Sequence, residues 1–390
     1  MLPRALVNAL DVPPAAGPSL VGPAGPGHLT LDGDDLVNMA SCNYLGLARH
    51  PSVLAAAHQA LEQWGLGTAA TRTLSGSTTL HRDLEQRLGA WVGTADAVLF
   101  SSCWTANAAV FAALSALAAR SGNALGVFSD RHDHASIIDG IKAQRDKRSQ
   151  LFRYDRENLD ELGRQLAATP PDTIKVIVTD GVFSMEGDQA PLPALLALAD
   201  RWDALLVVDD SHGVGVVGAT GRGCAEAQDV LGQVDVLVGT LGKALGGAVG
   251  GFAATTNELA AWMRASSRPF IFSNNPPVSV VAAALAALEV LSTSSEPLDT
   301  LRGRTRRLRD GIAALGLPTV AGEHPIVPVI IGAEEAAVEA SALLRRHGVF
   351  ATALAYPIVP RGQARLRLQV SAAHTVEDID LALTGLEGVR

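Results

Sequence analysis

Aromatic residues, cysteine and clustered positive charge are all scarce in this sequence. Only 4% of the 390 residues are aromatic although 48% are apolar, so the core must be built from Ala, Val, Leu and Ile. A chain of this length buries most of its surface on folding and needs no disulfide or metal for stability. The cysteines are odd in number and widely spaced, which excludes a disulfide framework and a zinc site and favours a reducing compartment. They are Cys42, Cys103 and Cys224.

The lack of basic clusters and of long apolar runs argues against two classes of partner. The net charge is −9, which disfavours nucleic acid. The segment before Asp11 has only about six apolar residues, too few for the core of a signal peptide. The longest apolar stretches, near 105–119 and 276–288, are shorter than a membrane span. We expect a soluble, cytoplasmic protein that binds neither nucleic acid nor membrane.

The chain is long enough for two or three domains, and its patterns divide it into three parts. Residues 1–45 are expected to form an N-terminal arm, in which 11–27 are irregular. Residues 46–290 are expected to form a large domain, and 291–390 a smaller one. In the large domain, continuous apolar runs alternate with helical patterns such as 79–92, 105–119 and 191–202, which is typical of a parallel sheet covered on both faces. The expected strands are 97–100, 126–129, 174–179, 205–209, 234–239 and 248–253.

After about residue 290 the pattern becomes that of a small α+β domain. It begins with an Arg-rich helix over 297–315. Strands are expected over 326–331, 349–354 and 364–370, and helices over 334–346 and from about 376. The fold class is therefore α/β, with a mostly parallel sheet between layers of helices and a smaller α+β domain after it.

Four of the expected strands run directly into polar, mostly ionisable residues. Ligands of open α/β sheets bind beyond the carboxyl ends of the strands, so we expect these residues to share one cleft. They are Asp130–His134, Asp180–Ser184, Asp209–His212 and Thr240–Lys243.

Lys243 lies among glycines in the segment GTLGKALGG, residues 239–247. It is either a surface lysine that follows a strand or a lysine that forms a Schiff base with a planar cofactor, which the glycines allow to approach the backbone. A P-loop is disfavoured, because the spacing is GxxGK and Ala244 stands where Ser or Thr is required.

Asp209, His212 and His134 favour the cofactor interpretation. A carboxylate such as Asp209 can keep a pyridine nitrogen protonated, which makes the ring of pyridoxal 5′-phosphate (PLP) an electron sink. His212 is a candidate donor to the phenolic oxygen of that ring, and His134 is a candidate to stack on it. Taken singly, Asp209 could instead cap a helix or turn, and each histidine could be an ordinary polar residue.

The phosphate of such a cofactor needs backbone N–H groups and hydroxyls at a helix start. The turn Ser101–Thr105 lies between an expected strand and an expected helix, and it includes Ser102, Cys103 and Trp104. Thr240 is a second candidate.

Two motifs suggest other functions. The segment Gly213–Gly218 matches the GxGxxG motif of dinucleotide-binding folds, but the Gly-rich residues after it do not readily continue as the required helix. His132 and His134 alternate in DRHDH and could bind a metal, although no second cluster with ligand spacing supports a metal hydrolase.

In the segment ARLRLQV, Arg365, Arg367 and Gln369 share one face of a strand. This face is either a solvated sheet edge or a clamp for a carboxylate. The pattern alone leaves both open.

Together these motifs resemble those of the α-oxoamine synthases, fold-type I PLP enzymes that join an amino acid to an acyl-CoA. The resemblance covers roughly residues 40–385. Within the family, FSSCWTAN, SRPFIFSN and YPIVPRGQARLRLQVSAAHT are most similar to 2-amino-3-ketobutyrate CoA ligases (glycine C-acetyltransferases), and SGSTTLH is closer to 8-amino-7-oxononanoate synthases. The other motifs are SCNYLGLARHP, DHASIIDG, TDGVFSMEGD, VDDSHGVGVVGATGRG and GTLGKALGG.

The resemblance implies a role for each matching residue. Lys243 carries PLP and later acts as acid and base, Asp209 pairs with the pyridine nitrogen, His212 with the phenolic oxygen, and His134 stacks on the ring. Ser184 lies near cofactor or substrate, and Arg367 binds the amino-acid carboxylate. The N–H groups of Cys103 and Trp104, with Ser102 and Thr240, hold the phosphate, and Ser273 and Asn274 reach it from the partner subunit of a homodimer.

Three positions depart from the family pattern. Cys42 stands where relatives usually have an Asn that helps hold the substrate carboxylate, which leaves glycine open as the substrate. Trp104 replaces Phe or Tyr. The stretch Ala355-Tyr356-Pro357 lacks the mobile Arg of 8-amino-7-oxononanoate synthases, which argues against that activity.

The sequence thus predicts a PLP-dependent C-acyltransferase that condenses an amino acid, glycine first, with an acyl-CoA or acyl carrier to give an α-aminoketone. The alternative within the family is a decarboxylating condensation of the 8-amino-7-oxononanoate synthase type, with alanine or another amino acid. Two alternatives from other classes are an NAD-dependent oxidoreductase and a non-catalytic protein with a PLP-enzyme fold.

Overall fold

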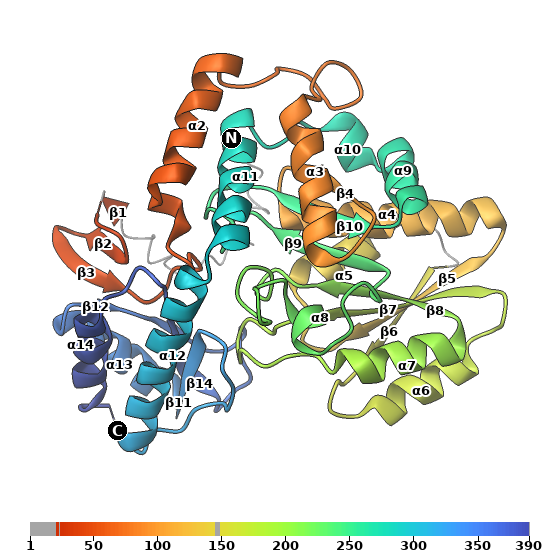
Figure 1. The fold of residues 1–390 in the computed structure, drawn as a ribbon. Coiled ribbons are helices and arrows are strands. Elements are labelled where there is room, and N and C mark those ends of the chain that lie inside the picture. Colours follow the sequence, from red (N-terminus) through yellow and green to blue (C-terminus); the bar gives the residue numbers. More distant parts are fainter. Residues whose placement is uncertain (1–20, 23, 145–148, 390) are drawn as a thin grey trace, which may run out of the picture.

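The computed structural model describes residues 21–22, 24–144 and 149–389. Its centre is a sheet of seven strands (Figure 1). Five neighbouring strands are parallel, and β10 runs antiparallel to both of its neighbours. In spatial order the strands are β4 (Asp96–Phe100), β10 (Gly251–Thr255), β9 (Val236–Thr240), β8 (Ala204–Asp209), β7 (Thr173–Asp180), β5 (Ala124–Asp130) and β6 (Ser149–Tyr154).

Helices cover both faces of this sheet, because consecutive strand residues point to opposite sides and both sides are apolar. Val176 and Val178 pack on one side, against α4 (Cys103–Ser121), α5 (Ala135–Lys142), α9 (Asn257–Ser266) and α10 (Arg268–Phe272). Ile177 packs on the other side, in the core that includes α3 (Thr79–Val92), α6 (Leu159–Ala168) and α7 (Leu192–Trp202). The expected α/β sandwich is confirmed.

The C-terminal part is built around a sheet of three strands whose central strand is β14 (Ala364–Gln369), antiparallel to β11 (Ile326–Gly332) and β13 (Thr352–Leu354). Because β14 is the central strand, the polar face formed by Arg365, Arg367 and Gln369 is not a solvated sheet edge. The helices of this part are α12 (Glu296–Ala314), α13 (Glu334–Arg346) and α14 (Val376–Leu386).

The described residues before 45 are joined to the C-terminal part. The strands β1 (Val21–Gly22), β2 (His28–Leu31) and β3 (Asp34–Asn38) form a sheet with β12 (Val349–Phe350), in which β3 pairs with β12 in parallel. After η1 (Leu47–Arg49), the helix α2 (Pro51–Trp64) lies beside α11 (Val278–Thr293) (Figure 1). The short helix α8 (Cys224–Ala227) completes the set.

Most expected strands agree with the observed ones to within a few residues, and the differences are of two kinds. The strand over 149–154 was not expected, because SQLFRY is half-buried at the edge of the sheet and carries no continuous apolar run. The expected strand over 349–354 is two strands in different sheets. The irregular segment 11–27 lies largely outside the described residues. The division into three domains remains a prediction.

Among the described helices, none is by itself long and apolar enough to cross a membrane. The helices α11 and α12 meet that criterion only as a pair bent by 79°.

Candidate active site

The carboxyl ends of β5, β7, β8 and β9 surround a cavity of about 190 Å³ beside the first turn of α4. Each strand contributes the polar residues that follow its last apolar residue, as expected where a parallel sheet opens. The lining residues are Cys103, Trp104, His134, Ser136, Asp180, Val182, Ser184, Asp209, Ser211, His212, Thr240 and Lys243. The structure therefore brings together residues that are up to 140 positions apart in the chain.

Asp209 is buried and surrounded by donors. Its Oδ2 accepts the side-chain amide of Asn107 at 2.7 Å, and its Oδ1 accepts the backbone N–H of Ser211 at 3.1 Å and the hydroxyl of the same serine. The thiol of Cys103 lies 3.7 Å from Oδ2. These donors converge on the two carboxyl oxygens of Asp209 and hold the group in place.

His212 lies in the same cavity as Lys243, and its ring is held from behind. Its Nδ1 lies 2.7 Å from the hydroxyl of Tyr44, and its backbone oxygen accepts Nε2 of His324 at 3.0 Å. Burial, and then the positive charge of Lys243, hold the pKa of His212 well below 6.5. The ring is therefore neutral at neutral pH.

The loop that carries Lys243 consists of turns between β9 and β10 and contains no helix. A P-loop is thereby excluded, since its lysine begins a helix. The hydroxyl of Thr240 accepts the N–H of Gly242 at 3.0 Å and donates to the oxygen of Gly250 at 3.2 Å. Its hydroxyl proton thus already has a backbone acceptor.

The start of α4 presents backbone donors to the cavity. Ser102 is its N-cap and accepts the N–H of Thr105 at 3.1 Å. Within the described part of the chain, the N–H groups of Cys103 and Trp104 have no partner, as is usual for a first helical turn. This turn can bind an anion through these groups and through the helix dipole.

His134 begins α5 and faces Trp104. Its Nδ1 lies 2.8 Å from the hydroxyl of Ser136, and its ring centroid lies 6.0 Å from that of Trp104, edge to face. Burial lowers the pKa of His134. Because Ser136 also accepts the amide of Asn107 at 2.9 Å, a chain of hydrogen bonds joins His134 to Asp209.

Asp180 is the acid that sequence reasoning placed at a strand end without giving it a role. It pairs with Asp209 across β7 and β8, is buried, and its Oδ1 has no partner among the described residues. Burial and the negative charges of Asp133 and Asp209 raise its pKa well above the ordinary value. The carboxyl group of Asp180 therefore holds its proton more tightly than an ordinary aspartate does.

The two arginines of β14 have different partners, and this difference shows which of them can bind a further carboxylate. Arg365 is buried and paired with Glu186 at 3.1 Å. Arg367 donates to the backbone oxygen of Ser184 at 3.0 Å, and its buried Nε has no partner among the described residues. Arg367 is therefore the arginine with an unused donor near the cavity. Cys42 lies on the same side and donates to Oε1 of Gln369 at 3.1 Å.

Ser273 and Asn274 follow α10 and do not line this cavity. Ser273 is half-buried, whereas Asn274 is exposed. Their expected role in the site of a partner subunit stays a prediction.

The GxGxxG segment is not a dinucleotide site, because it forms turns and its glycines serve packing. A Cβ at Gly213 would lie 2.0 Å from Oδ1 of Asp210, and a Cβ at Gly215 would lie 2.6 Å from Cβ of Ala244. Burial raises the pKa of Asp210 to about 6. In the DRHDH segment, His132 bonds to Arg156 at 3.0 Å, so the two histidines have separate partners.

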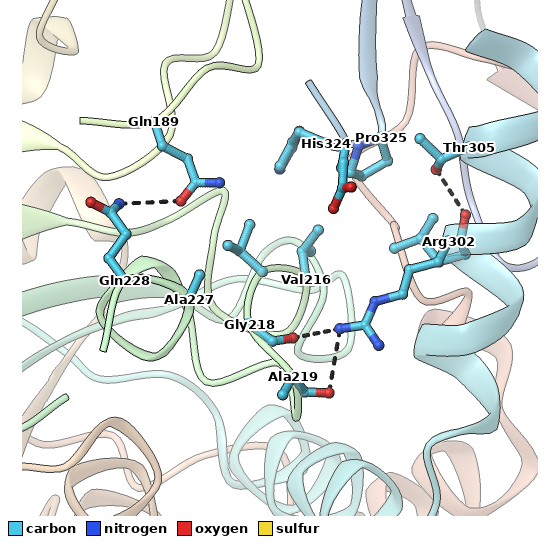
Figure 2. Close-up of a pocket in the computed structure, with 13 residues that line it drawn as sticks. Gln189, Val216, Gly218, Ala219, Ala227, Gln228, Arg302, Thr305, His324 and Pro325 are labelled. Carbon is cyan, nitrogen blue, oxygen red and sulfur yellow. Dashed lines mark hydrogen bonds between the residues drawn. The ribbon is translucent and has the colours of Figure 1, made fainter. Parts of the chain in front are cut away.

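A larger cavity of about 560 Å³ lies between the 216–219 loop, α8 and α12 (Figure 2). Arg302 spans it by donating to the carbonyl oxygens of Gly218 and Ala219. His324 lines it, but none of the residues at the strand ends does. The chemistry of the smaller cavity makes that one the candidate active site.

The smaller cavity fits PLP. It combines the primary amine of Lys243, the carboxyl group of Asp209 and free N–H groups at a helix start, which match the aldehyde, the pyridine nitrogen and the phosphate of that cofactor. Sequence reasoning missed Asn107 and Tyr44, which bond to this set, and placed Gln369 beside Arg367 without its bond to Tyr44. The only local signal was their place inside the motifs FSSCWTAN, SCNYLGLARHP and ARLRLQV.

Comparison with known proteins agrees with this site. The family model for aminotransferase class I and II matches residues 34–386. The 2-amino-3-ketobutyrate CoA ligase of Escherichia coli K12 is 42% identical over 90% of this chain and 87% of its own length. The 8-amino-7-oxononanoate synthase of Thermoanaerobacter pseudethanolicus is 40% identical over 95% of this chain and 91% of its own.

Solved structures give the same result. The serine palmitoyltransferase of Sphingomonas wittichii superposes with a TM-score of 0.89 at 29% identity, covering 99% of this chain and 94% of that one. A serine palmitoyltransferase solved with PLP has a TM-score of 0.89 at 31% identity, covering 95% and 92%. With the fold, the site and these relatives in agreement, the chain belongs to the α-oxoamine synthases, the PLP-dependent acyltransferases of aminotransferase class I and II.

Proposed function

We propose that this enzyme condenses glycine with a short acyl-CoA to give a 2-amino-3-ketoacid and free CoA. The observation that carries this proposal is the free Nε of Arg367, a buried donor for an amino-acid carboxylate next to a cavity that holds Lys243 and Asp209. The relatives named 2-amino-3-ketobutyrate CoA ligase support the choice of substrates.

The proposed roles toward the cofactor follow from position. Lys243 carries PLP, and Asp209, supported by Asn107, pairs with the pyridine nitrogen. His212 donates to the phenolic oxygen, and His134 covers the ring. The N–H groups of Cys103 and Trp104, with Ser102 and Thr240, hold the phosphate; Ser184 lies near the substrate, and Ser273 and Asn274 complete the phosphate site of a partner subunit.

The cofactor, when bound, supplies the electron sink that stabilises negative charge on the α-carbon of the amino acid. The amine of Lys243 accepts the α-proton, and Arg367 holds the carboxylate beside Cys42. The α-carbon then forms a bond to the thioester carbon, the C–S bond breaks, and CoA leaves as a thiol after it receives a proton. Trp104 and His134 lie edge to face at the exposed side of this cavity.

A second candidate is a decarboxylating condensation with alanine or another amino acid. The relative from Thermoanaerobacter pseudethanolicus favours it, since it is nearly as similar to this chain as the E. coli enzyme. We further propose a cytoplasmic homodimer, in which Ser273 and Asn274, outside the cavity of their own chain, reach the cavity of the partner subunit.

The test is a release assay for CoA with the PLP-loaded protein. Glycine, alanine and serine are each combined with acetyl-CoA and with longer acyl-CoAs, and the products are analysed for retained carboxylate. We expect glycine with acetyl-CoA to be fastest and the carboxylate to be kept. Faster reaction of alanine with a long acyl-CoA and loss of CO₂ would support the second candidate, and a Lys243→Ala variant with full activity would contradict both.

A further inference from the structure

A chain of hydrogen bonds lies behind His212, on the side away from the cavity. The hydroxyl of Tyr44 lies 2.7 Å from Nδ1 of His212 and 3.3 Å from Oε1 of Gln369. The thiol of Cys42 donates to the same Oε1 at 3.1 Å. Tyr44 and Gln369 are both buried, so no water competes for these partners. The 42–44 segment and β14 are thus joined in one chain of hydrogen bonds that ends on Nδ1 of His212.

The partners of Gln369 fix the direction of these bonds. Its Nε2 donates to the backbone oxygen of Ala40 at 2.7 Å, so Oε1 is an acceptor. Tyr44 has one hydroxyl proton and two possible acceptors. The acceptor at 2.7 Å is His212, whereas the one at 3.3 Å already receives the thiol proton of Cys42. The hydrogen bond to Nδ1 of His212 is the shorter of the two, and this nitrogen does not receive the thiol proton of Cys42. We therefore assign the hydroxyl proton of Tyr44 to Nδ1.

The surroundings of His212 keep its ring neutral, so only one nitrogen carries a proton. Burial first, and then Lys243, His324, Arg367 and His134, lower the pKa of His212 and so oppose a second proton. Burial raises the pKa of Tyr44, which keeps its hydroxyl protonated and able to donate. If Nδ1 accepts from Tyr44, the proton of the ring resides on Nε2.

We propose that Tyr44 is a positioning residue that holds His212 in the tautomer with its proton on Nε2, and that Cys42 supports this choice by occupying Gln369. The inference deepens the proposed function, because that tautomer has a donor for the phenolic oxygen of PLP. Neither Tyr44 nor Gln369 contacts the cavity itself.

The test observes the ring nitrogens of His212 directly. The full chain is labelled with ¹⁵N-histidine, and nitrogen spectra are recorded with and without PLP; His212→Gln identifies the signals. We expect wild type to show the proton on Nε2. In Tyr44→Phe the ratio of the two tautomers should fall by about fivefold to tenfold, the value of one net hydrogen bond. An unchanged ratio in folded Tyr44→Phe would overturn the proposal.

Tyr154→Phe is the matched control. Tyr154 is equally buried, but its hydroxyl donates to the backbone oxygen of Val178. The Tyr154→Phe variant should leave the His212 signals in place. An equal change in Tyr154→Phe and Tyr44→Phe would mean a general packing effect and would also overturn the proposal.

Two variants of Cys42 keep the test decisive if Tyr44→Phe does not fold. Cys42→Ala frees Oε1 of Gln369 to accept the tyrosine proton, so we expect the ratio to fall in the same direction as in Tyr44→Phe. Cys42→Ser retains a donor and should restore the tautomer ratio of His212. A larger fall of this ratio in Cys42→Ser than in Cys42→Ala would contradict the proposal. If PLP produces no visible absorption band in any variant, the proposed function fails. The tautomer ratio in the PLP-free chain is measured independently of PLP, so it still supports or contradicts the role of Tyr44.

Discussion

Asn107 donates its side-chain amide to Oδ2 of Asp209 at 2.7 Å, although the two residues are 102 positions apart. Asn107 lies one turn inside α4, after the residues that we propose to hold the phosphate. One helix therefore presents donors to an anion at its end and to a carboxylate from its side. This geometry couples the two ends of the proposed cofactor site.

Replacement of Asn107 by Leu should weaken PLP binding. The buried carboxylate of Asp209 loses a charge-assisted hydrogen bond worth about 1.5–3 kcal/mol, and Kd should rise about 10- to 100-fold. Titration of the PLP-free protein, followed by visible absorbance, measures it. Ser115→Ala is the control, because Ser115 is buried on the same helix and does not line the cavity. A Kd that stays within twofold of wild type would show that Asp209 does not need the amide.

Replacement of Arg367 by Lys should affect the amino-acid substrate and leave PLP bound. Lysine lacks the planar fork that grips a carboxylate with two bonds, so we expect KM for the amino acid to rise about 10- to 100-fold. Steady-state kinetics at saturating acyl-CoA measures this change.

Arg365→Lys is the matched variant for Arg367, two residues away on the same strand face. Arg365 is paired with Glu186, and we expect its replacement to lower the free energy of unfolding while KM stays within about twofold, as for a structural ion pair. Equal KM changes in both variants would refute the assignment of the carboxylate to Arg367.

Sequence patterns predicted the residues that end strands and missed those that reach them from elsewhere. Lys243, Asp209, His212 and His134 follow apolar runs, so their place at one sheet edge is a local consequence of chain direction. Tyr44 reaches His212 across 168 positions and Gln369 across 325. Such contacts depend on how segments far apart in the chain pack against one another, and no local sequence period predicts that.

Hybrid dimers test the proposed role of Ser273 and Asn274 in the partner subunit. Lys243→Ala and a Ser273→Ala, Asn274→Ala double variant should each have little activity. When they are mixed and allowed to exchange subunits, each hybrid dimer has one intact site, so activity should recover to about one quarter of wild type, as two-fold symmetry requires.

The double variant mixed with wild type is the control for the hybrid experiment, and size-exclusion chromatography verifies the dimer. If the mixture of the two inactive variants stays inactive after exchange, each chain uses its own Ser273 and Asn274, and the shared site is wrong.

The stability of the protein should fall as the pH drops below about 6.5, in part because of His324. Burial lowers the pKa of His324 to about 4 from its ordinary value of 6.5. Between these two values the unfolded chain binds the proton and the folded chain does not, so stability rises with pH in this window. His324 should therefore contribute about 3 kcal/mol above pH 6.5 that is lost progressively toward pH 4.

Urea unfolding of wild type and His324→Gln across pH 4 to 7 measures that contribution. Glutamine keeps a donor for the backbone oxygen of His212 but does not titrate, so the variant should lose part of the slope. Asp210, with a pKa raised to about 6, changes stability in the opposite sense and is common to both proteins, so the difference between them isolates His324. His58→Gln is the control, since His58 is exposed on α2. Parallel curves for wild type and His324→Gln would mean that His324 is not buried as a neutral ring.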